Sequence, residues 1–220
     1  KDEERFFGVD AIAKRARFPK QVFTFMHEFL GKQYNDEVIN KYISDFFIPY
    51  DITQNEESSS ISFNIKFNKE DYNFTTEEIF GMQFRYIKFL SDKFSNTDVR
   101  DCVITVPAYF GYKERNAIVQ AVELSKLNLL SLVSENVAAA VQFSIDRMFN
   151  ETEYYMFYNM GSSNLQVTLA SFRSEQKNNK TKEVHKQVNI LGEAWEKQVG
   201  GNHFNYKIIK YLLNKFDALD

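Results

Sequence analysis

The sequence predicts an α/β fold, and the middle of the chain carries the clearest evidence. Val103–Val106 and Leu129–Val133 are short apolar runs typical of buried strands. A stretch with helical character follows each of them, Tyr112–Leu127 after the first and Glu135–Met148 after the second. Such alternation predicts parallel strands joined by crossover helices. With 220 residues, the chain is long enough for one large domain or two smaller lobes.

The first part of the chain combines helical pieces with strands. Residues 5–34 have helical stretches that are interrupted at Phe18-Pro19, because the residue before a proline is disfavoured in a helix. Phe46–Ile52 and Ser60–Phe67 are expected to be strands, and the polar run Asn55–Ser60 between them a hairpin tip or loop.

A capping box predicts the start of the longest helix. Thr75 and Glu78 have the spacing at which the hydroxyl and the carboxylate each accept from the other residue's amide. The helix is expected to run to about Phe94. Its apolar face is broad enough to pack against two neighbours. This face consists of Ile79, Phe80, Met82, Phe84, Tyr86, Ile87, Leu90 and Phe94.

After residue 150 the pattern changes to a β-hairpin. Tyr154–Tyr158 and Leu165–Phe172 are its expected strands, and Asn159–Asn164 is the turn between them. Residues 165, 167 and 169 fall on one face of the second strand. The polar, lysine-rich run Arg173–Lys186 is expected to be an exposed loop, and a strand resumes at Val188–Leu191. A final helix follows, with an apolar stripe formed by Phe204, Ile208, Leu212 and Phe216.

Composition excludes several classes of function. The chain has 27 basic and 30 acidic side chains and a net charge of -3, so it lacks the basic surface that nucleic-acid binding requires. No apolar run approaches the length of about 18 residues needed to span a membrane. The three histidines are scattered without a metal-binding spacing. The single cysteine, Cys102, is expected to be a small buried hydrophobe, and Trp195 is expected to be partly buried.

Two segments have the form of a phosphate site. The turn Asn159–Asn164 is rich in small residues, so its backbone amides can point into one concavity that holds an anion. Gly200 and Gly201 precede a helix start, where phosphates also bind. The alternatives are an ordinary hairpin turn for the first segment and a loop ending in an N-cap at Asn202 for the second.

Four motifs in order resemble one family. VITVPAYF at Val103–Phe110, SENVAAA at Ser134–Ala140, MFYNMGS at Met156–Ser162 and VGGNHF at Val199–Phe204 are similar to the nucleotide-binding domain of the 70-kDa heat-shock chaperone superfamily. The order and the spacing agree over essentially the whole chain. RFFGVDAIAKRARFPK near the start and FLGKQ at Phe29–Gln33 look most like the large divergent members, the 110-kDa heat-shock and 170-kDa glucose-regulated chaperones. FYNMGS and LGKQ are closer to the glucose-regulated class.

The resemblance implies an actin-like ATPase (ribonuclease H-like) fold with two lobes around a cleft for ATP or ADP with Mg²⁺. Residues 1–150 would form most of lobe I and residues 151–220 the beginning of lobe II. On that map, the first phosphate-binding hairpin of lobe I would precede Lys1, and most of lobe II would follow Asp220. We therefore expect the chain to be a fragment of the nucleotide-binding domain.

The same resemblance assigns roles to individual residues. Glu135 matches the family's glutamate that organises water and magnesium, and Asn159 stands where active members carry an aspartate. Gly161, Ser162, Ser163 and Asn164 are expected to contact phosphate together with Gly200, Gly201 and Asn202. Pro107 and Arg115 match residues that transmit the nucleotide state. Their alternative roles are a strand end for Pro107 and a surface salt bridge for Arg115.

Several positions depart from the pattern of active members. Ser162 and Ser163 replace glycines, Asn164 replaces a threonine, and Gln166 replaces an aspartate. An ungapped alignment of residues 5–19 also places Ile12 where hydrolysing members have a lysine. Because phosphoryl transfer depends on electrostatic stabilisation, these changes favour binding with weak or no hydrolysis.

Three functions stay open. The first is a weakly hydrolysing large chaperone that promotes ADP release from a conventional chaperone of the same superfamily and holds unfolded clients. The second is a fully active chaperone ATPase, which Glu135 favours, and the third is an interaction scaffold that no longer binds nucleotide. The resemblance to the glucose-regulated class implies the endoplasmic-reticulum lumen, with the cytoplasm as the alternative.

Overall fold

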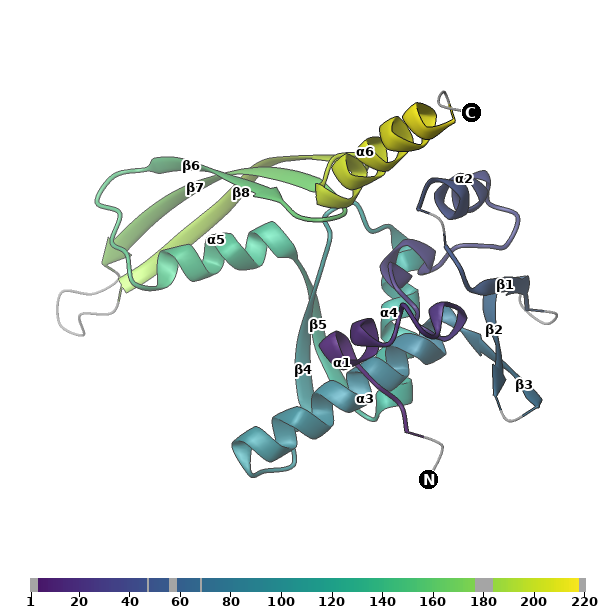
Figure 1. The fold of residues 1–220 in the computed structure, drawn as a ribbon. Helices are drawn as coiled ribbons and strands as arrows, with labels where there is room; N and C mark the ends of the chain where they lie inside the picture. The colour runs from purple at the N-terminus through teal and green to yellow at the C-terminus, as the bar shows by residue number, and fades with distance from the viewer. Residues whose placement is uncertain (1–3, 47, 56–58, 68, 177–183, 218–220) are drawn as a thin grey trace. The chain divides into compact units, whose positions relative to one another are not determined.

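The computed structural model describes residues 4–46, 48–55, 59–67, 69–176 and 184–217, and its fold is mixed α/β (Figure 1). The chain forms two compact units. The first contains Lys1–Val103 and Phe110–Ser131, and the second contains Ile104–Tyr109 and Leu132–Asp220. The chain passes between the units within two strands, β4 (Asp101–Val106) and β5 (Asn128–Ser134).

The first unit begins with short helices and a three-stranded sheet. Its helical elements are α1 (Gly8–Ala13), 3-10 turns at Pro19–Gln21 and Met26–Phe29, and α2 (Glu37–Phe46). Its strands β1 (Asp51–Gln54), β2 (Ile61–Phe67) and β3 (Glu70–Thr75) pair antiparallel in the order β1-β2-β3. The helical pieces, the break at Phe18-Pro19 and the strand at 61–67 confirm the prediction.

An aromatic core joins these elements. Phe29 and Phe63 are fully buried, and their rings meet edge to face with centroids 5.4 Å apart. Ile39 from α2 packs into the same cluster. The strand predicted at 46–52 is wrong, because Phe46 ends α2 and its ring packs on Tyr42 one turn earlier. The strand begins only at Asp51.

Helices α3 (Thr76–Ser95) and α4 (Tyr112–Ser125) pack against each other in the first unit (Figure 1). The capping box is confirmed: Glu78 N donates to Thr75 Oγ1 over 3.2 Å, and Thr75 N donates to Glu78 Oε2 over 2.8 Å. The helices approach closely at Gly81, where a Cβ atom would lie 2.9 Å from Leu124 Cβ.

Helix α3 packs against α4 and against the first sheet, which confirms the prediction of two neighbours, but its last turns are more exposed than its broad apolar face implies. Phe94 is 95% exposed, and Leu90 is 46% exposed. The close approach to α4 occurs at Gly81, in the first third of the helix, so the last turns have little cover among the described residues.

Strands β4 and β5 pair with each other. At their starts, Asn128 N donates to the Arg100 carbonyl over 2.7 Å. At their ends, one side chain, Gln166, contacts both Ala108 and Glu135. The two strands therefore run in the same direction, as the alternation of strands and helices predicts. Cys102 in β4 is half-buried, and burial together with the nearby Asp101 raises the pKa of its thiol.

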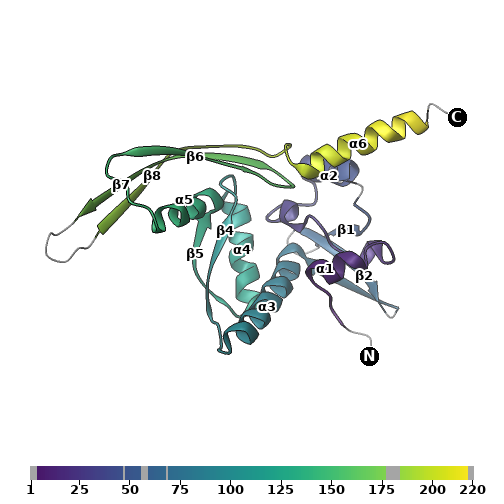
Figure 2. The same cartoon turned by 60° about the vertical axis from the view of Figure 1, so that its left-hand side comes forward.

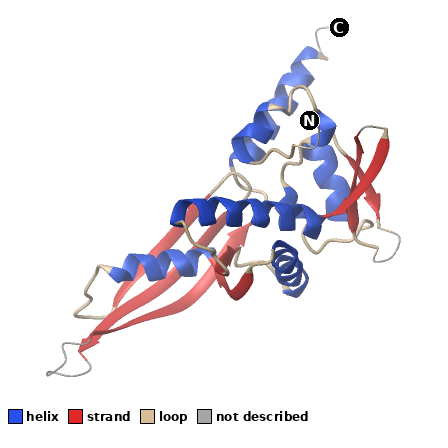
Figure 3. Ribbon diagram, turned by 90° about the horizontal axis from the view of Figure 1, so that it is seen from below, coloured by secondary structure: helices blue, strands red, loops and turns tan. Residues whose placement is uncertain are grey.

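The second unit is built on a long antiparallel sheet. Its strands β6 (Glu153–Met160), β7 (Leu165–Gln176) and β8 (Val184–Glu196) pair in that order. Helix α5 (Glu135–Ile145) lies along one face of this sheet (Figures 2 and 3). The core between them contains Ala140, Phe143, Phe149, Tyr155, Phe157, Ala170, Phe172 and Val188.

The face of β7 that packs on α5 is not the more apolar one. Residues 166, 168, 170 and 172 are buried, whereas Leu169 on the predicted apolar face is 43% exposed. Alternation along the strand puts Gln166 and Thr168 on the same face as Phe172. The helix covers that face because the aromatic cluster lies there, and two polar side chains become buried with it.

Strands β7 and β8 extend into the segment predicted to be a loop. Arg173 pairs with Gln187 and Gln176 with Val184, so the exposed loop expected at Arg173–Lys186 is wrong at both of its ends. Contacts with the end of α5 explain the extension: Lys186 Nζ donates to the Ser144 carbonyl over 2.8 Å. Residues 177–183 lie outside the described part of the chain.

Helix α6 (Gly201–Phe216) ends the described chain. Its N-cap is Gly200, so the alternative of an N-cap at Asn202 is wrong. The predicted stripe exists, but Phe204, Ile208 and Phe216 are each more than half exposed. No helix of the described residues is long and apolar enough to cross a membrane.

Candidate phosphate-binding site

Glu135 is the first residue of α5, directly after β5. Its carboxylate accepts a hydrogen bond from Gln166 Nε2 at 2.7 Å. A carboxylate in the first turn of a helix is also favoured by the helix dipole. The position of Glu135 is therefore fixed both by the strand–helix junction and by a side chain from β7.

Gln166 is fully buried and uses both ends of its amide. Its Oε1 accepts from Ala108 N at 2.9 Å, and its Nε2 donates to Glu135 and, at 3.2 Å, to Asn164 Oδ1. A buried amide is costly unless its hydrogen bonds are satisfied. This side chain meets that condition and links three segments of the second unit: the end of β4, the start of α5 and the hairpin β6–β7.

Asn159 lies directly opposite Gln166 in the β6–β7 register. Opposite residues of an antiparallel pair share a face, so Asn159 is on the same face of the sheet as Gln166. Unlike Gln166, Asn159 is exposed. The structure thus brings the two amide residues and Glu135 to one end of the sheet.

The hairpin loop Gly161–Asn164 is closed by a hydrogen bond from Gly161 N to the Asn164 carbonyl at 3.0 Å. Ser163 is nearly buried and Ser162 is exposed, and their hydroxyls lie 3.5 Å apart. Within the described part of the chain, the amides of Ser162 and Ser163 donate no hydrogen bond. Ser163 N lies against Gly200, so the amide and hydroxyl of the exposed Ser162 are the groups of the loop that are open to an anion.

The start of α6 is docked on this loop. Gly201 N donates to the Gly161 carbonyl over 3.1 Å, and Asn202 N donates to the Ser162 carbonyl over 2.8 Å. These amides, expected to meet phosphate, bond the hairpin instead. A Cβ atom on Gly200 would lie 2.6 Å from the Ser162 carbonyl oxygen, so glycine is required for this approach. Nucleotide contact at residues 200–202 stays a prediction.

Sequence reasoning missed an aromatic group beside the loop. Tyr109 Oη accepts from Asn164 Nδ2 at 2.9 Å, and the Tyr109 ring lies 6.2 Å from that of Trp195. Lys197 Nζ lies 4.5 Å from the Tyr109 ring centre, within cation–π distance. Trp195 is 47% exposed, which confirms the expected partial burial.

A second polar group on the same face was also missed. Asn136 Nδ2 donates to Thr168 Oγ1 over 3.0 Å, and Glu193 Oε1 accepts from Ser134 Oγ at 3.1 Å and from Thr168 Oγ1 at 3.4 Å. Glu193 lies opposite Thr168 in the β7–β8 register. The available signal was the alternation of the polar residues Gln166 and Thr168 with the apolar residues of β7.

Pro107 and Arg115 occupy different units. Pro107 directly follows β4 and precedes Ala108, whose amide bonds Gln166. Arg115 is in α4, and its Nε donates to the Phe110 carbonyl over 2.8 Å. The described residues show no salt bridge of Arg115. The signalling roles of both residues stay predictions, as does the role implied for Ile12, which is 61% exposed in α1.

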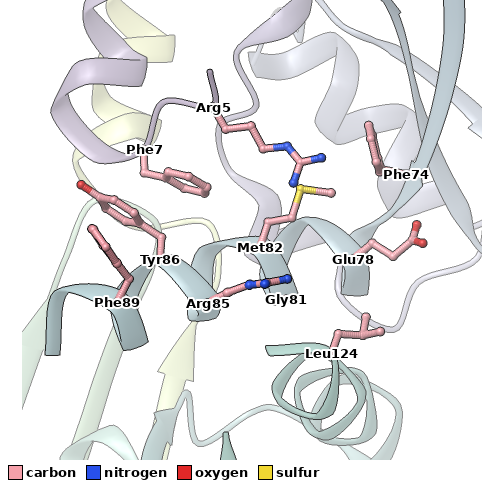
Figure 4. Close-up of a pocket in the computed structure, with 10 residues that line it drawn as sticks. All are labelled: Arg5, Phe7, Phe74, Glu78, Gly81, Met82, Arg85, Tyr86, Phe89 and Leu124. Atoms are coloured by element: carbon pink, nitrogen blue, oxygen red, sulfur yellow. The ribbon is translucent and has the colours of Figure 1, made fainter. Parts of the chain in front are cut away.

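The first unit contains a separate cavity of about 390 Å³ beside α3 (Figure 4). The ring of Phe7 stacks on that of Tyr86, with centroids 4.5 Å apart, and the side chains of Arg5 and Arg85 also line the space. None of the residues predicted to bind nucleotide lines it.

The side chains at this end of the sheet can be compared with the ligands that the expected Mg²⁺ ion would need. Among the described residues, no group of three or more His, Cys, Asp or Glu side chains is placed to hold a metal. Mg²⁺ prefers a nearly octahedral shell of oxygen ligands. At this end of the sheet, Gln166 points an N–H group at the Glu135 carboxylate, and Asn159 and Gln166 replace two of the acids implied by the resemblance. The residues present therefore do not fit a carboxylate-organised Mg²⁺ site.

The sequence profile described as Hsp70 protein matches residues 1–219. The chain belongs to the Hsp70 family. Membership confirms the actin-like ATPase fold that the motifs implied, and the mixed α/β structure agrees with it. Members of the Hsp70 family bind ATP and ADP, usually with Mg²⁺, and act as chaperones on unfolded clients together with co-chaperones.

Curated relatives within the Hsp70 family cover nearly all of the chain. Hypoxia up-regulated protein 1 of Xenopus tropicalis is 30% identical over 99% of the chain, and that of Danio rerio is 31% identical over 99%. Heat shock 70 kDa protein 17 of Arabidopsis thaliana is 30% identical over 97%. Hypoxia up-regulated protein 1 is of the large chaperone class, which confirms the resemblance to that class. The chain spans 33%, 22% and 24% of the length of these relatives, respectively.

Proposed function

We propose that this chain supplies the second phosphate-binding hairpin of a chaperone nucleotide-binding domain, which binds ATP or ADP and hydrolyses ATP weakly or not at all. The observation that carries the proposal is the hydrogen bond between Glu135 and Gln166, with Asn159 opposite Gln166 in the sheet. The family's glutamate is retained and held in place, but the groups around it are neutral amides. The assignment of residues 1–150 to lobe I and 151–220 to lobe II is part of the same proposal.

The chemistry of phosphoryl transfer explains the expected weakness. Catalysis by this class of ATPase consists mainly of positioning and of electrostatic stabilisation of the charge that develops on the phosphates. Asn159 and Gln166 carry no charge with which to hold a cation or to polarise the attacking water. The amide and hydroxyl of the exposed Ser162 are still available to bind phosphate oxygens, so binding is expected to survive the loss of hydrolysis.

The full-length protein gives the decisive test. We expect calorimetric titration to show ADP binding near the micromolar range, equivalent to about -8 kcal/mol, and steady-state phosphate release to be far below that of a conventional Hsp70. The double variant Asn159→Asp/Gln166→Asp is expected to raise phosphate release, and the surface variant Asn189→Asp to leave it unchanged. Turnover equal to that of a conventional member would exclude weak hydrolysis, and absence of nucleotide binding would favour the interaction scaffold.

We also propose that the full-length protein promotes ADP release from a conventional chaperone of the same superfamily and holds unfolded clients. Its support is the similarity to the large chaperone class over nearly the whole chain. Release of a fluorescent ADP analogue from the partner chaperone, with and without the full-length protein, measures the first activity. Light scattering of a heat-denatured client measures the second. An unchanged release rate contradicts the exchange role, and undiminished scattering contradicts the client-holding role.

The endoplasmic-reticulum lumen is the proposed compartment, and N-glycosylation offers a readout. Three sequons begin at Asn73, Asn150 and Asn179. Asn150 is exposed, whereas the Thr75 hydroxyl of the first sequon already accepts the capping hydrogen bond. Asn179 lies outside the described residues. In cells that produce the protein, Asn150→Gln is expected to abolish one endoglycosidase-sensitive shift in mass. Digestion of the protein by protease added to intact microsomes without detergent would contradict lumenal residence.

A further inference from the structure

We infer that Gln166 is a positioning residue that takes the place of a divalent cation, so that the site binds nucleotide with an affinity that does not depend on Mg²⁺. The inference rests on the proposed nucleotide binding and deepens it. Gln166, rather than a cation, would hold Glu135 in place before and during binding. This differs from the Mg²⁺-linked binding that is usual in the family.

The geometry around Glu135 supports this role for Gln166. Gln166 Nε2 is 2.7 Å from Glu135 Oε2, so an N–H group already satisfies this carboxylate oxygen. The other end of the same amide accepts from Ala108 N, which fixes its orientation. Because Gln166 is fully buried, this arrangement is held by packing as well as by its hydrogen bonds.

The neighbouring carboxylate, that of Glu193, also has neutral hydrogen-bond donors as its partners. Glu193 accepts from the hydroxyls of Ser134 and Thr168, and Thr168 in turn accepts from the Asn136 amide. Within the described residues, every hydrogen-bond partner of the Glu135 and Glu193 carboxylates is thus a neutral donor. No charged side chain and no metal ion is needed to hold either carboxylate in place.

Charge explains the consequence for the ligand. Acidic side chains around polyphosphate repel it unless a cation lies between them, and this repulsion is large where water is excluded. The resemblance implies an acid at positions 135, 159 and 166. Only Glu135 is an acid here, because positions 159 and 166 carry amides. Removal of Mg²⁺ from ADP should therefore add little repulsion at the hairpin loop, because positions 159 and 166 carry no charge and Glu135 and Glu193 are both held by neutral donors. A purely structural role for Gln166 would not predict so small an effect.

The first experiment is calorimetric titration of ADP into the full-length protein, once with excess Mg²⁺ and once with a chelator. We expect the two dissociation constants to agree within about twofold, which is less than 0.5 kcal/mol. Binding that weakens tenfold or more in the chelator would overturn the inference while leaving the proposed function intact. Absence of binding under both conditions would overturn the proposed function and the inference with it.

The second experiment restores the acid. Gln166→Asp is expected to weaken ADP binding about tenfold or more in the chelator and to regain most of the affinity with Mg²⁺, because a second buried carboxylate then faces Glu135. Gln187→Asp makes the same change at an exposed position of β8 and is expected to have no effect.

Asn159→Asp covers the possibility that the buried substitution prevents folding. Position 159 is exposed and opposite Gln166, so this variant introduces the charge without disturbing the core. We expect it to make ADP binding depend on Mg²⁺ in the same direction as Gln166→Asp. If the folded variants bind ADP equally well with and without Mg²⁺, the amides do not set the cation dependence and the inference is wrong.

Discussion

The backbone of Gly200 approaches that of Ser162 so closely that a Cβ atom on Gly200 would lie 2.6 Å from the Ser162 carbonyl oxygen. Two hydrogen bonds beside this contact join the first turn of α6 to the hairpin loop, from Gly201 N and Asn202 N. The contact gives Gly200 a packing role that is independent of any ligand.

Gly200→Ala is therefore expected to destabilise the second unit. The added methyl group must displace backbone atoms rather than a flexible side chain, and overpacking of this kind costs about 1–3 kcal/mol. Chemical denaturation of the full-length protein, followed by circular dichroism, measures the loss. Gly192→Ala is the matched control, because a Cβ atom there meets nothing within 4 Å. A loss for Gly200→Ala no larger than for the control would contradict the packing role.

Gly31→Ala is expected to destabilise the first unit for two reasons. Gly31 has φ +63, which costs an alanine about 1–2 kcal/mol, and its Cβ atom would lie 2.6 Å from the Lys113 carbonyl carbon. Gly8 has φ +59 but open space around it, so Gly8→Ala carries the first cost alone. The difference in unfolding free energy between the two variants isolates the close approach. Equal values would show that the chain relaxes freely at Lys113.

Glu78→Ala should cost about 1 kcal/mol more than Glu77→Ala. Both changes remove a negative charge from the first turn of α3, but only Glu78 accepts from Thr75 N in the capping box. Urea denaturation of the two variants under the same conditions gives the comparison. If Glu77→Ala were as costly, the helix dipole rather than the capping box would dominate at this terminus.

Tyr50 should make the first unit less stable at high pH. Burial raises the pKa of its hydroxyl well above the ordinary value, and Tyr50 Oη donates to the Thr24 carbonyl over 2.5 Å. The folded state therefore keeps this proton at a pH where the unfolded chain has lost it. The stabilisation is fully present below about pH 10 and declines above it by up to about 1.4 kcal/mol per pH unit.

Tyr50→Phe is expected to flatten this decline, although it also loses about 1 kcal/mol at neutral pH with the hydrogen bond. Tyr112→Phe, at a residue that is 83% exposed, is the control. Unfolding free energies measured between pH 8 and about pH 11 test the prediction. A decline as steep in Tyr50→Phe as in the control would show that other groups cause the alkaline loss.

Local signals in the sequence predicted much of the fold. The capping box at Thr75 fixes the start of α3 through two short-range hydrogen bonds, and the runs at 103–106 and 129–133 lie within β4 and β5. These features depend on neighbours in the sequence, which is why they could be predicted. Helix α2 was missed because it is fixed by contacts beyond its own turns: Tyr42 packs on Phe46 and also on the distant Phe29.

Long-range contacts explain the other misses. The ends of β7 and β8 look like a polar loop, yet they pair because Lys186 bonds the end of α5 and Ser174 bonds Phe149. At the candidate site, the motifs predicted Glu135 and Asn159. Only the register of β6 and β7 and the packing of α5 showed that Gln166 joins them.

Trp195 gives the site an optical signal of its own. It is the single tryptophan of the chain, and its ring lies beside Tyr109, which bonds Asn164, which in turn bonds Gln166. Because the indole is about half exposed, its emission is sensitive to changes in its surroundings. A rearrangement of the hairpin loop would therefore be visible as a change in intrinsic fluorescence, and the signal lost in Trp195→Phe would identify its origin without any attached label.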